Sequence, residues 1–276
     1  GEQGSVAVVE RIAAVIESFA SQLPAGSRPR AVGICAPGPL DHVEGRLLTL
    51  INIPGMSNTP LRALLQDRLG IPARLEHDAK AAALADFHYG AGRGARSMTY
   101  TVLGTGVGAA IILNGDLYYG EGNASGEMGH ITIDRDGEME NSGVRGAVQR
   151  YTSGPNLARR YSEALLTTAA PDGEPITGEY VATRALEGDP VAVRLIQEAG
   201  EALGIAVASM AMILDIETNV IGGGVARLGD LLLAPARQAM QRYCFSALGA
   251  RVKIVATALG DAGPLLGCAY MARTLI

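Results

Sequence analysis

Tryptophan is absent from this 276-residue chain and phenylalanine occurs only three times, so aromatic side chains can fill little of a core. The hydrophobic content is nevertheless 48%, which predicts a folded protein with a core of Ala, Val, Leu and Ile. Cysteine is scarce too. Cys35, Cys244 and Cys268 are widely spaced and form no CxxC pair, which argues against a disulfide framework or an all-cysteine metal site. We interpret them as buried thiols of a cytoplasmic protein.

Basic clusters and long apolar runs are missing as well. The chain carries 23 Lys and Arg residues against 28 Asp and Glu, a net charge of −5. This balance gives no electrostatic reason to expect binding to nucleic acid or to an anionic membrane. No apolar run approaches the roughly 18 residues of a membrane-spanning helix, and the first ten residues lack the basic region of a signal peptide.

Strand-like and helix-like segments alternate along the chain, which predicts the α/β class. We expect strands within residues 30–36, 73–76, 98–113, 116–119, 131–133, 219–221 and 252–256, and helices within residues 5–23, 60–70, 79–89, 190–214, 228–241 and 263–275. Residues 90–94 resemble a link, so we predict two domains, residues 1–90 and 91–276. The last helix is a candidate to pack back on the first of them.

Four short motifs could carry chemistry, and each has a plain structural alternative. The turn Gly104-Thr105-Gly106 lets backbone N–H groups approach a phosphate, but it is also an ordinary glycine-rich β-turn. Asp78 follows a predicted strand, where it could accept a proton from a hydroxyl group or simply cap the helix of residues 79–89. The other two motifs are Gly126-Glu127-Met128-Gly129-His130, which could bind a polyhydroxylated ligand, and Gly222-Gly223-Gly224, which could pack against a purine or ribose or form a strand-to-helix turn.

In this order, the motifs closely resemble the ROK family (repressor, open reading frame, kinase) over nearly the whole chain. The resemblance is carried by Ala36-Pro37-Gly38-Pro39, Glu76-His77-Asp78-Ala79, Gly104-Thr105-Gly106-Val107-Gly108, Gly126-Glu127-Met128-Gly129-His130, Ile221-Gly222-Gly223-Gly224-Val225 and Ala258-Leu259-Gly260-Asp261-Ala262-Gly263. It implies a ribonuclease-H-like, actin/hexokinase-type fold with two lobes. It also implies an ATP- and Mg²⁺-dependent hexose kinase, usually a homodimer, or a sugar-sensing repressor built on the same domain.

The resemblance also assigns roles to single residues. Asp78 matches the base for the sugar hydroxyl. Positions near the sugar are Gly38, Asn52, His77, Glu127, His130 and Gln149. Positions near the nucleotide are Gly104, Thr105 and Gly106 beside the phosphates, and Gly222, Gly223 and Gly224 beside the adenosine.

Three departures from the family pattern stand out. The family usually carries a cysteine-rich zinc motif where this chain has residues 140–149, with Glu140, Ser142 and Ala147 in place of the cysteines. We therefore predict no structural zinc and expect packing to hold this loop, while Gln149 replaces a sugar-binding Glu. His77 replaces an Asn that contacts a sugar hydroxyl, which puts the choice of sugar in question. The DxGGT phosphate motif of the family is missing before residue 5, so we expect the chain to lack the leading strands of its first lobe.

These departures keep a second function open. A sugar kinase acting on a hexose or N-acylhexosamine is the leading prediction, and a non-catalytic, sugar-sensing regulator is the alternative.

Overall fold

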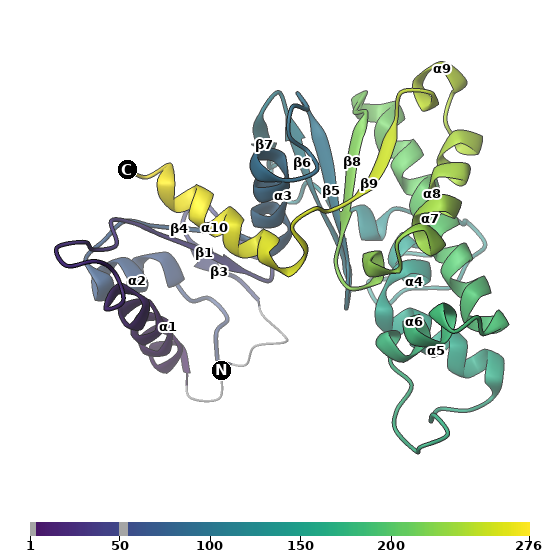
Figure 1. The fold of residues 1–276 in the computed structure, drawn as a ribbon, viewed down its shortest axis with the longest axis horizontal. Helices are drawn as coiled ribbons and strands as arrows, with labels where there is room; N and C mark the ends of the chain where they lie inside the picture. The colour runs from purple at the N-terminus through teal and green to yellow at the C-terminus, as the bar shows by residue number, and fades with distance from the viewer. Residues whose placement is uncertain (1–3, 50–54) are drawn as a thin grey trace. The chain divides into compact units, whose positions relative to one another are not determined.

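The computed structural model describes residues 4–49 and 55–276, an α/β chain that divides into two units (Figure 1). The first unit contains the chain up to Ala85 together with residues 262–276, and the second contains residues 86–261. The sequence indicates a division at residues 90–91, with the last helix numbered in the second domain but named as a candidate to pack back on the first. The units instead divide inside a helix, and the last helix belongs to the first unit.

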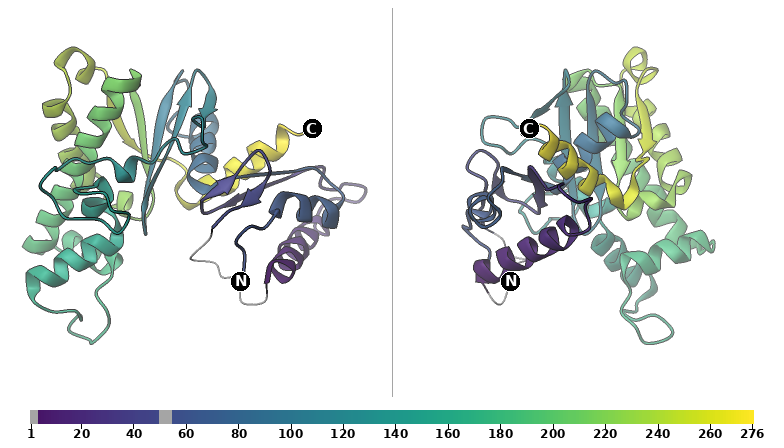
Figure 2. Two further views of the ribbon diagram at one scale, coloured as in Figure 1. Left: turned by 180° about the vertical axis from the view of Figure 1, so that it is seen from behind. Right: turned by 60° about the vertical axis from the view of Figure 1, so that its left-hand side comes forward.

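The first unit is built on a pair of parallel strands, β1 and β4, with Ala36 opposite His77. Its elements are α1 (Gly4–Ala20), β1 (Val32–Ala36), β2 (Leu40–Asp41), β3 (Arg46–Leu47), α2 (Leu61–Leu69), β4 (Ala73–His77), the start of α3 (Asp78–Tyr89) and α10 (Gly263–Arg273). Helix α10 lies on one side of the strand pair, and α1 and α2 lie on the other (Figures 1 and 2). A Cβ atom on Gly33 would collide with the backbone of Cys268, so a glycine is needed in β1 for α10 to pack this closely.

The second unit is built on a five-stranded sheet in the order β7-β6-β5-β8-β9. Its strands are β5 (Met98–Leu103), β6 (Val107–Leu113), β7 (Asp116–Tyr118), β8 (Thr218–Gly222) and β9 (Lys253–Ala256). β5, β8 and β9 run parallel, β6 runs antiparallel to β5, and β7 runs antiparallel to β6. The hairpin predicted at Asn114-Gly115 is confirmed, and both residues have the positive φ that such a turn requires.

Helices pack on one face of this sheet, with α7 and α8 alongside each other (Figure 1). They are α4 (Val148–Thr152), α5 (Gly154–Leu165), α6 (Gly178–Leu186), α7 (Pro190–Leu214), α8 (Asp230–Tyr243) and α9 (Ser246–Gly249), with 3₁₀ turns at Met128–His130, Val225–Leu228 and Gly260–Ala262. Helix α7 starts where the sequence predicts, because Asp189 accepts hydrogen bonds from the N–H groups of Val191 and Ala192 and Pro190 occupies the first turn. Its buried face is aliphatic, as the composition requires.

The strand predicted at residues 131–133 is wrong. Thr132 forms an isolated bridge with Ala147, because the chain leaves the sheet after the 3₁₀ turn and returns toward α4. Within the described ranges, no helix is both long and apolar enough to cross a bilayer.

Asp86 is a fully buried carboxylate that holds two distant segments of the second unit together. Its Oδ2 accepts a hydrogen bond from the hydroxyl of Thr257 at 2.5 Å, and its Oδ1 accepts from the N–H groups of Ala91 at 3.0 Å and Ala258 at 3.4 Å. The segment after α3 and the segment after β9 therefore share one acceptor.

We expect Asp86→Ala to lower the free energy of unfolding by about 3 kcal/mol, because three donors lose a charged acceptor. Asp86→Asn keeps one carbonyl oxygen and the side-chain shape, so its cost should be about 1 kcal/mol. Urea denaturation of the two variants measures the difference. Equal and small losses would contradict the structural role assigned to the carboxylate.

Candidate functional site

In the first unit, the loop after β1 brings Gly38 to the end of the strand pair where β4 ends at His77 and α3 begins at Asp78. The imidazole of His77 lies so close to Gly38 that a Cβ atom there would be 2.8 Å from Cδ2 of the ring. Carboxyl ends of parallel strands are the usual place for a ligand in α/β proteins. The structure thus groups three of the residues predicted around the sugar. Asn52, predicted to join them, lies outside the described residues.

Asp78 is the first residue of α3, and its side chain is half exposed. Its Oδ1 accepts a hydrogen bond from the N–H of Ala79 at 2.6 Å and lies 3.0 Å from Nδ1 of His77. Within the described residues, its Oδ2 accepts no hydrogen bond. One oxygen atom therefore fixes the carboxylate, and the other is available to a ligand. The hydrogen bond from Ala79 and binding of a ligand through Oδ2 are compatible in this geometry.

In the second unit, the turn Gly104-Thr105-Gly106 joins β5 to β6. The N–H of Gly104 donates to the carbonyl of Gly106, and the carbonyl of Gly104 accepts from the N–H of Gly154, the first residue of α5. The Thr105 side chain is exposed. The turn is consequently fixed against the beginning of a helix while its tip stays open.

β8 ends at Gly222 next to this turn, and Gly223 and Gly224 follow the strand. A Cβ atom would meet the hydroxyl of Tyr100 at Gly222 and the backbone of Leu103 at Gly223, where φ is +89°. Nothing lies within 4 Å of such an atom at Gly224. A cavity of about 1000 Å³ opens there, and Gly104, Thr105 and Gly224 line it together with the beginnings of α5 and α6. The two predicted nucleotide motifs therefore border one cavity.

The segment Gly126–His130 lies flat on β6. Cβ atoms at Gly126 and Gly129 would collide with the backbone of Ala109 and Val107, which explains both glycines. Met128 is buried between them, whereas Glu127 is exposed, with its Oε2 3.8 Å from Nε2 of His130. The packing of Met128 thus presents the two polar side chains predicted to bind sugar at the surface.

Gln149 contacts protein groups on both sides of its amide. Its Oε1 accepts a hydrogen bond from the N–H of Val107 at 3.3 Å, just after the glycine turn. Its Nε2 donates to Oε1 of Glu140 at 2.9 Å. The other Glu140 oxygen accepts from the N–H of Ser142 at 2.6 Å, and the Ser142 hydroxyl lies 3.2 Å from Nδ1 of His130. A continuous chain of polar contacts therefore connects the glycine turn to His130.

Glu140 is buried and carries the charge of this chain of contacts. Burial opposes its ionisation, but hydrogen bonds from Ser142 and Gln149 outweigh burial and lower its pKa to about 2. Sequence reasoning missed this role, since it treated Glu140 only as a lost cysteine.

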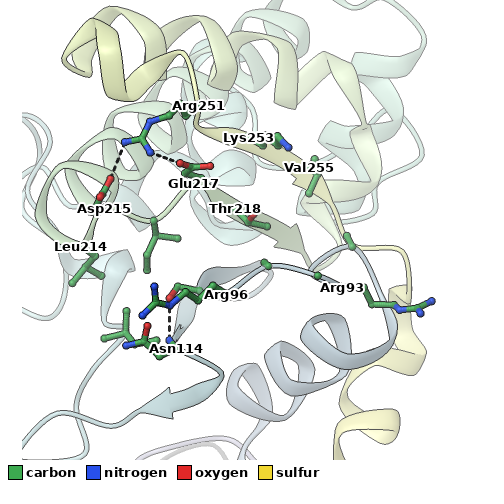
Figure 3. Close-up of a pocket in the computed structure, with 16 residues that line it drawn as sticks. Arg93, Arg96, Asn114, Leu214, Asp215, Glu217, Thr218, Arg251, Lys253 and Val255 are labelled. Carbon is green, nitrogen blue, oxygen red and sulfur yellow. Dashed lines mark hydrogen bonds and ion pairs between the residues drawn. The ribbon is translucent and has the colours of Figure 1, made fainter.

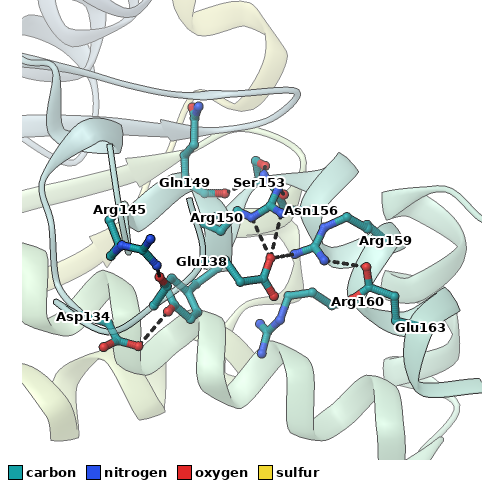
Figure 4. Close-up of polar contacts among 12 residues, drawn as sticks. Asp134, Glu138, Arg145, Gln149, Arg150, Ser153, Asn156, Arg159, Arg160 and Glu163 are labelled. Carbon is teal, nitrogen blue, oxygen red and sulfur yellow. Dashed lines mark hydrogen bonds and ion pairs between the residues drawn. The ribbon is translucent and has the colours of Figure 1, made fainter. Parts of the chain in front are cut away.

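A second polar cluster connects the loop before α4, which contains Glu138 and Glu140, to α4 and α5 (Figure 4). Glu138 lies 2.7 Å from the guanidinium of Arg150 and 2.9 Å from that of Arg159. Burial tends to raise the pKa of Glu138, but the hydrogen bond from Arg150 and the charge of Arg159 lower it overall. Polar contacts therefore hold much of this loop, in addition to the packing that the sequence predicts at the buried residues Ala147 and Val148.

The side chains at residues 140–149 fit a structural zinc ion poorly. Both oxygens of Glu140 are already hydrogen-bonded, and the positions of the remaining family cysteines hold Ser142 and Ala147. More broadly, no three His, Cys, Asp or Glu side chains of residues 4–49 and 55–276 group in a way that could hold a metal ion. Mg²⁺ does not need such a group, because it is commonly held by one or two carboxylates and the phosphates of a nucleotide.

Comparisons with known proteins agree with this organisation. The chain matches the ROK family over residues 3–275. It is 30% identical to a glucokinase of Thermotoga maritima, over 100% of this chain and 88% of that protein. It is also 29% identical to a xylose repressor of Caldicellulosiruptor bescii, over 87% of this chain but 61% of the repressor.

Solved structures extend the likeness to the fold. The ROK hexokinase from Thermus thermophilus superposes with a TM-score of 0.83 at 32% identity, over 99% of this chain and 88% of that one. A ROK family glucokinase from Streptomyces griseus, in complex with glucose and AMPPNP, gives 0.81 at 31% identity, over 98% and 89%. These matches confirm the expected two-lobed, actin/hexokinase-type fold, and the chain belongs to the ROK family.

Proposed function

We propose that the chain is a sugar kinase, which transfers the γ-phosphoryl group of ATP to a hydroxyl group of a hexose or N-acylhexosamine. The carboxylate of Asp78 carries this proposal. It is anchored through Oδ1 and has Oδ2 available, at the strand ends where Gly38 and His77 also lie. A general base must be fixed in place and still reach the proton that it accepts.

In the proposed reaction, Oδ2 of Asp78 accepts the proton of a sugar hydroxyl group. The hydroxyl oxygen forms a bond to the γ-phosphorus, and the bond between that phosphorus and the oxygen bridging to the β-phosphate breaks, which releases ADP. Glu127 and His130 would hydrogen-bond the sugar, and Asn52 is proposed to join them. Phosphoryl transfer depends mainly on positioning and on stabilising charge, so these contacts matter as much as the base.

The cavity of about 1000 Å³ is the proposed nucleotide site. The open tip of Gly104-Thr105-Gly106 would face the phosphates, and Gly222, Gly223 and Gly224 would let the adenosine approach the end of β8. Mg²⁺ bound with ATP would neutralise phosphate charge. The glucokinase from Streptomyces griseus, 31% identical, was solved with glucose and AMPPNP, which supports both ligands. Free thiols persist in a reducing compartment, so the three free cysteines support a cytoplasmic enzyme. The homodimer that the family resemblance implies stays a prediction.

The test is release of ADP by the purified chain with ATP and Mg²⁺, measured for glucose, mannose, galactose, N-acetylglucosamine and N-acetylmannosamine. We expect saturable, sugar-dependent release with at least one of them. A chain that binds ATP and a sugar but releases no ADP with any member of the panel would contradict the proposal.

A sugar-sensing regulator is the second candidate, because the xylose repressor matches 87% of this chain. His77, which replaces the Asn of the family pattern, also changes a sugar-contacting position without removing Asp78. Calorimetric titration separates the two functions. Binding of sugar by a chain that does not bind ATP would favour the sensor.

A further inference from the structure

Two thiols of the first unit contact each other, one in β1 and one in α10, which lie side by side (Figures 1 and 2). A Cβ atom on Gly33 would be 2.8 Å from Cα of Cys268, so the backbone of α10 rests on this face of β1. Side chains two residues apart in a strand lie on the same face, so Cys35 also faces α10. The thiol of Cys268 donates a hydrogen bond to Sγ of Cys35. Segments far apart in the chain thus bring two sulfur atoms together.

The thiol pair lies beside the beginning of α3. A Cβ atom on Gly267, the neighbour of Cys268, would be 1.9 Å from the carbonyl oxygen of Ala81. Ala81 is one helical turn after Asp78, the first residue of α3. Helix α10 therefore packs closely against both β1 and the turn of α3 that carries the proposed base.

The two thiols differ in how easily they ionise. The hydrogen bond from Cys268 stabilises a thiolate at Cys35 and lowers its pKa, although burial and the charge of Asp78 oppose this shift. The same hydrogen bond, together with burial and the charge of Cys35, raises the pKa of Cys268. Because the thiolate is the nucleophilic form of cysteine, Cys35 is the sulfur that reacts first.

Both cysteines are within reach of a small oxidant. Cys35 is half-buried, so part of its surface is exposed to solvent. Cys268 is buried within the protein, but it lines a cavity of about 500 Å³ together with Gly33 and Leu265. A molecule little larger than water can therefore approach the pair.

The second unit has a larger cavity, of about 800 Å³, beside the first residues of β8 and β9 (Figure 3). Its charged side chains do not converge on one point. Arg251 is paired with Asp215 and Glu217, and Figure 3 shows Arg96 on the other side of the hollow. This cavity indicates no particular ligand, whereas the two thiols of the first unit are already in contact.

We propose that Cys35 and Cys268 are a reversible oxidation site, which hydrogen peroxide converts to a disulfide between β1 and α10. In the first step, the thiolate sulfur of Cys35 attacks one peroxide oxygen and the O–O bond breaks. Cys35 becomes a sulfenic acid, and the hydroxide that leaves takes up a proton to form water. In the second step, the sulfur of Cys268 attacks the sulfur of Cys35, the S–S bond forms and the S–O bond breaks. The departing hydroxyl group leaves with the thiol proton of Cys268 as a second water molecule.

The electron balance of these steps is complete. The two thiols lose two electrons and two protons, and one peroxide molecule is reduced to two water molecules. The first step also prepares the second, because a neutral sulfenic acid at Cys35 removes the negative charge that holds Cys268 protonated. A thiol reductant reverses the reaction by exchange, and disulfides of the cytoplasm are usually transient in this way.

The disulfide is expected to slow phosphoryl transfer, a consequence that rests on the proposed function. A covalent bond holds two sulfur atoms closer together than a hydrogen bond does, so α10 must shift on β1. Gly267 leaves no free space against Ala81, so a shift of α10 is passed on to the turn of α3 that begins at Asp78. Because a small displacement of a catalytic group is costly, we expect kcat to fall by about tenfold on oxidation.

The test treats the reduced, folded full chain with hydrogen peroxide, blocks the remaining thiols with iodoacetamide and identifies linked peptides by mass spectrometry. We expect one disulfide, between Cys35 and Cys268, and the return of both thiols with dithiothreitol. Cys268→Ser should stop at a sulfenic acid on Cys35, which dimedone labels, and Cys35→Ser should form neither product. The matched control is Cys244→Ser, which removes the other free, buried thiol and should form the disulfide like the wild type.

Oxidation of the folded chain without a link between Cys35 and Cys268 would overturn the proposal, as would loss of the disulfide in Cys244→Ser. ADP release by the same samples tests the consequence for activity. We expect oxidised wild type to recover its kcat with dithiothreitol and Cys35→Ser to be insensitive to peroxide, whereas equal kcat before and after oxidation of the wild type would overturn the regulatory effect. If the reduced chain releases no ADP with any sugar, the proposed function fails, while the peptide masses still decide whether the disulfide forms.

Discussion

Asp78→Asn is expected to lower kcat for phosphoryl transfer by about 10²- to 10⁴-fold, the range that a positioned general base contributes. An amide at this position can still accept the hydrogen bond from the N–H of Ala79, so the beginning of α3 should be preserved. It cannot accept a proton from a sugar hydroxyl group. We therefore expect KM for ATP and the thermal midpoint of unfolding to change little, while turnover at saturating sugar is lost.

The matched control is Asp67→Asn, which removes a carboxylate from the surface of α2. Coupled ADP-release assays at saturating ATP and sugar compare both variants with the wild type. Retention of more than about a tenth of wild-type kcat by Asp78→Asn would remove Asp78 from the role of base. A fall in sugar affinity with kcat unchanged would assign it to binding alone.

Local rules predicted much of the fold. Asn114-Gly115 predicts a hairpin and Asp189-Pro190 predicts the start of α7, because in each case the residues that decide the geometry are adjacent in sequence. The two-residue strands β2 and β3 were not predicted, since so short a segment shows no periodicity. The last helix was a candidate to pack on the first domain, but its close contact with β1 depends on Gly33 and Cys268, which are far apart in the chain and meet only after folding.

The same distinction applies to the candidate site: features set by neighbouring residues were predicted, and contacts between distant segments were not. The glycine motifs were found because a glycine that allows close approach is visible in sequence, and Gly223 and Gly126 both meet backbone atoms in the structure. The polar connection from Val107 to His130 was not found. Its members come from four segments that the loop before α4 brings together, and no spacing rule links them.

Glu140 should matter to stability in proportion to the contacts it accepts. Glu140→Ala leaves the N–H of Ser142 and the amide of Gln149 without their acceptor, and we expect a loss of about 3 kcal/mol in the free energy of unfolding. The pKa of Glu140 is lowered to about 2, so this contribution is complete above pH 4.5 and is lost as pH falls toward 2. Urea denaturation should therefore give a constant difference between wild type and variant from pH 8 to pH 5, and a smaller one below pH 4.5.

Exchanging the two side chains tests the geometry more sharply than removing either. In Glu140→Gln/Gln149→Glu, the amide now at position 140 can accept from the N–H of Ser142 and donate to the carboxylate now at position 149, which can still accept from the N–H of Val107. Glu140→Gln alone leaves one oxygen for two donors, and Gln149→Glu alone places two carboxylates together, so each should cost about 1–3 kcal/mol. We expect the exchange to cost less than either single substitution, with a coupling energy above about 1 kcal/mol in a double-mutant cycle. Additive losses would show that residues 140 and 149 stabilise the loop separately, and Glu121→Gln, an exposed neutralisation, controls for charge.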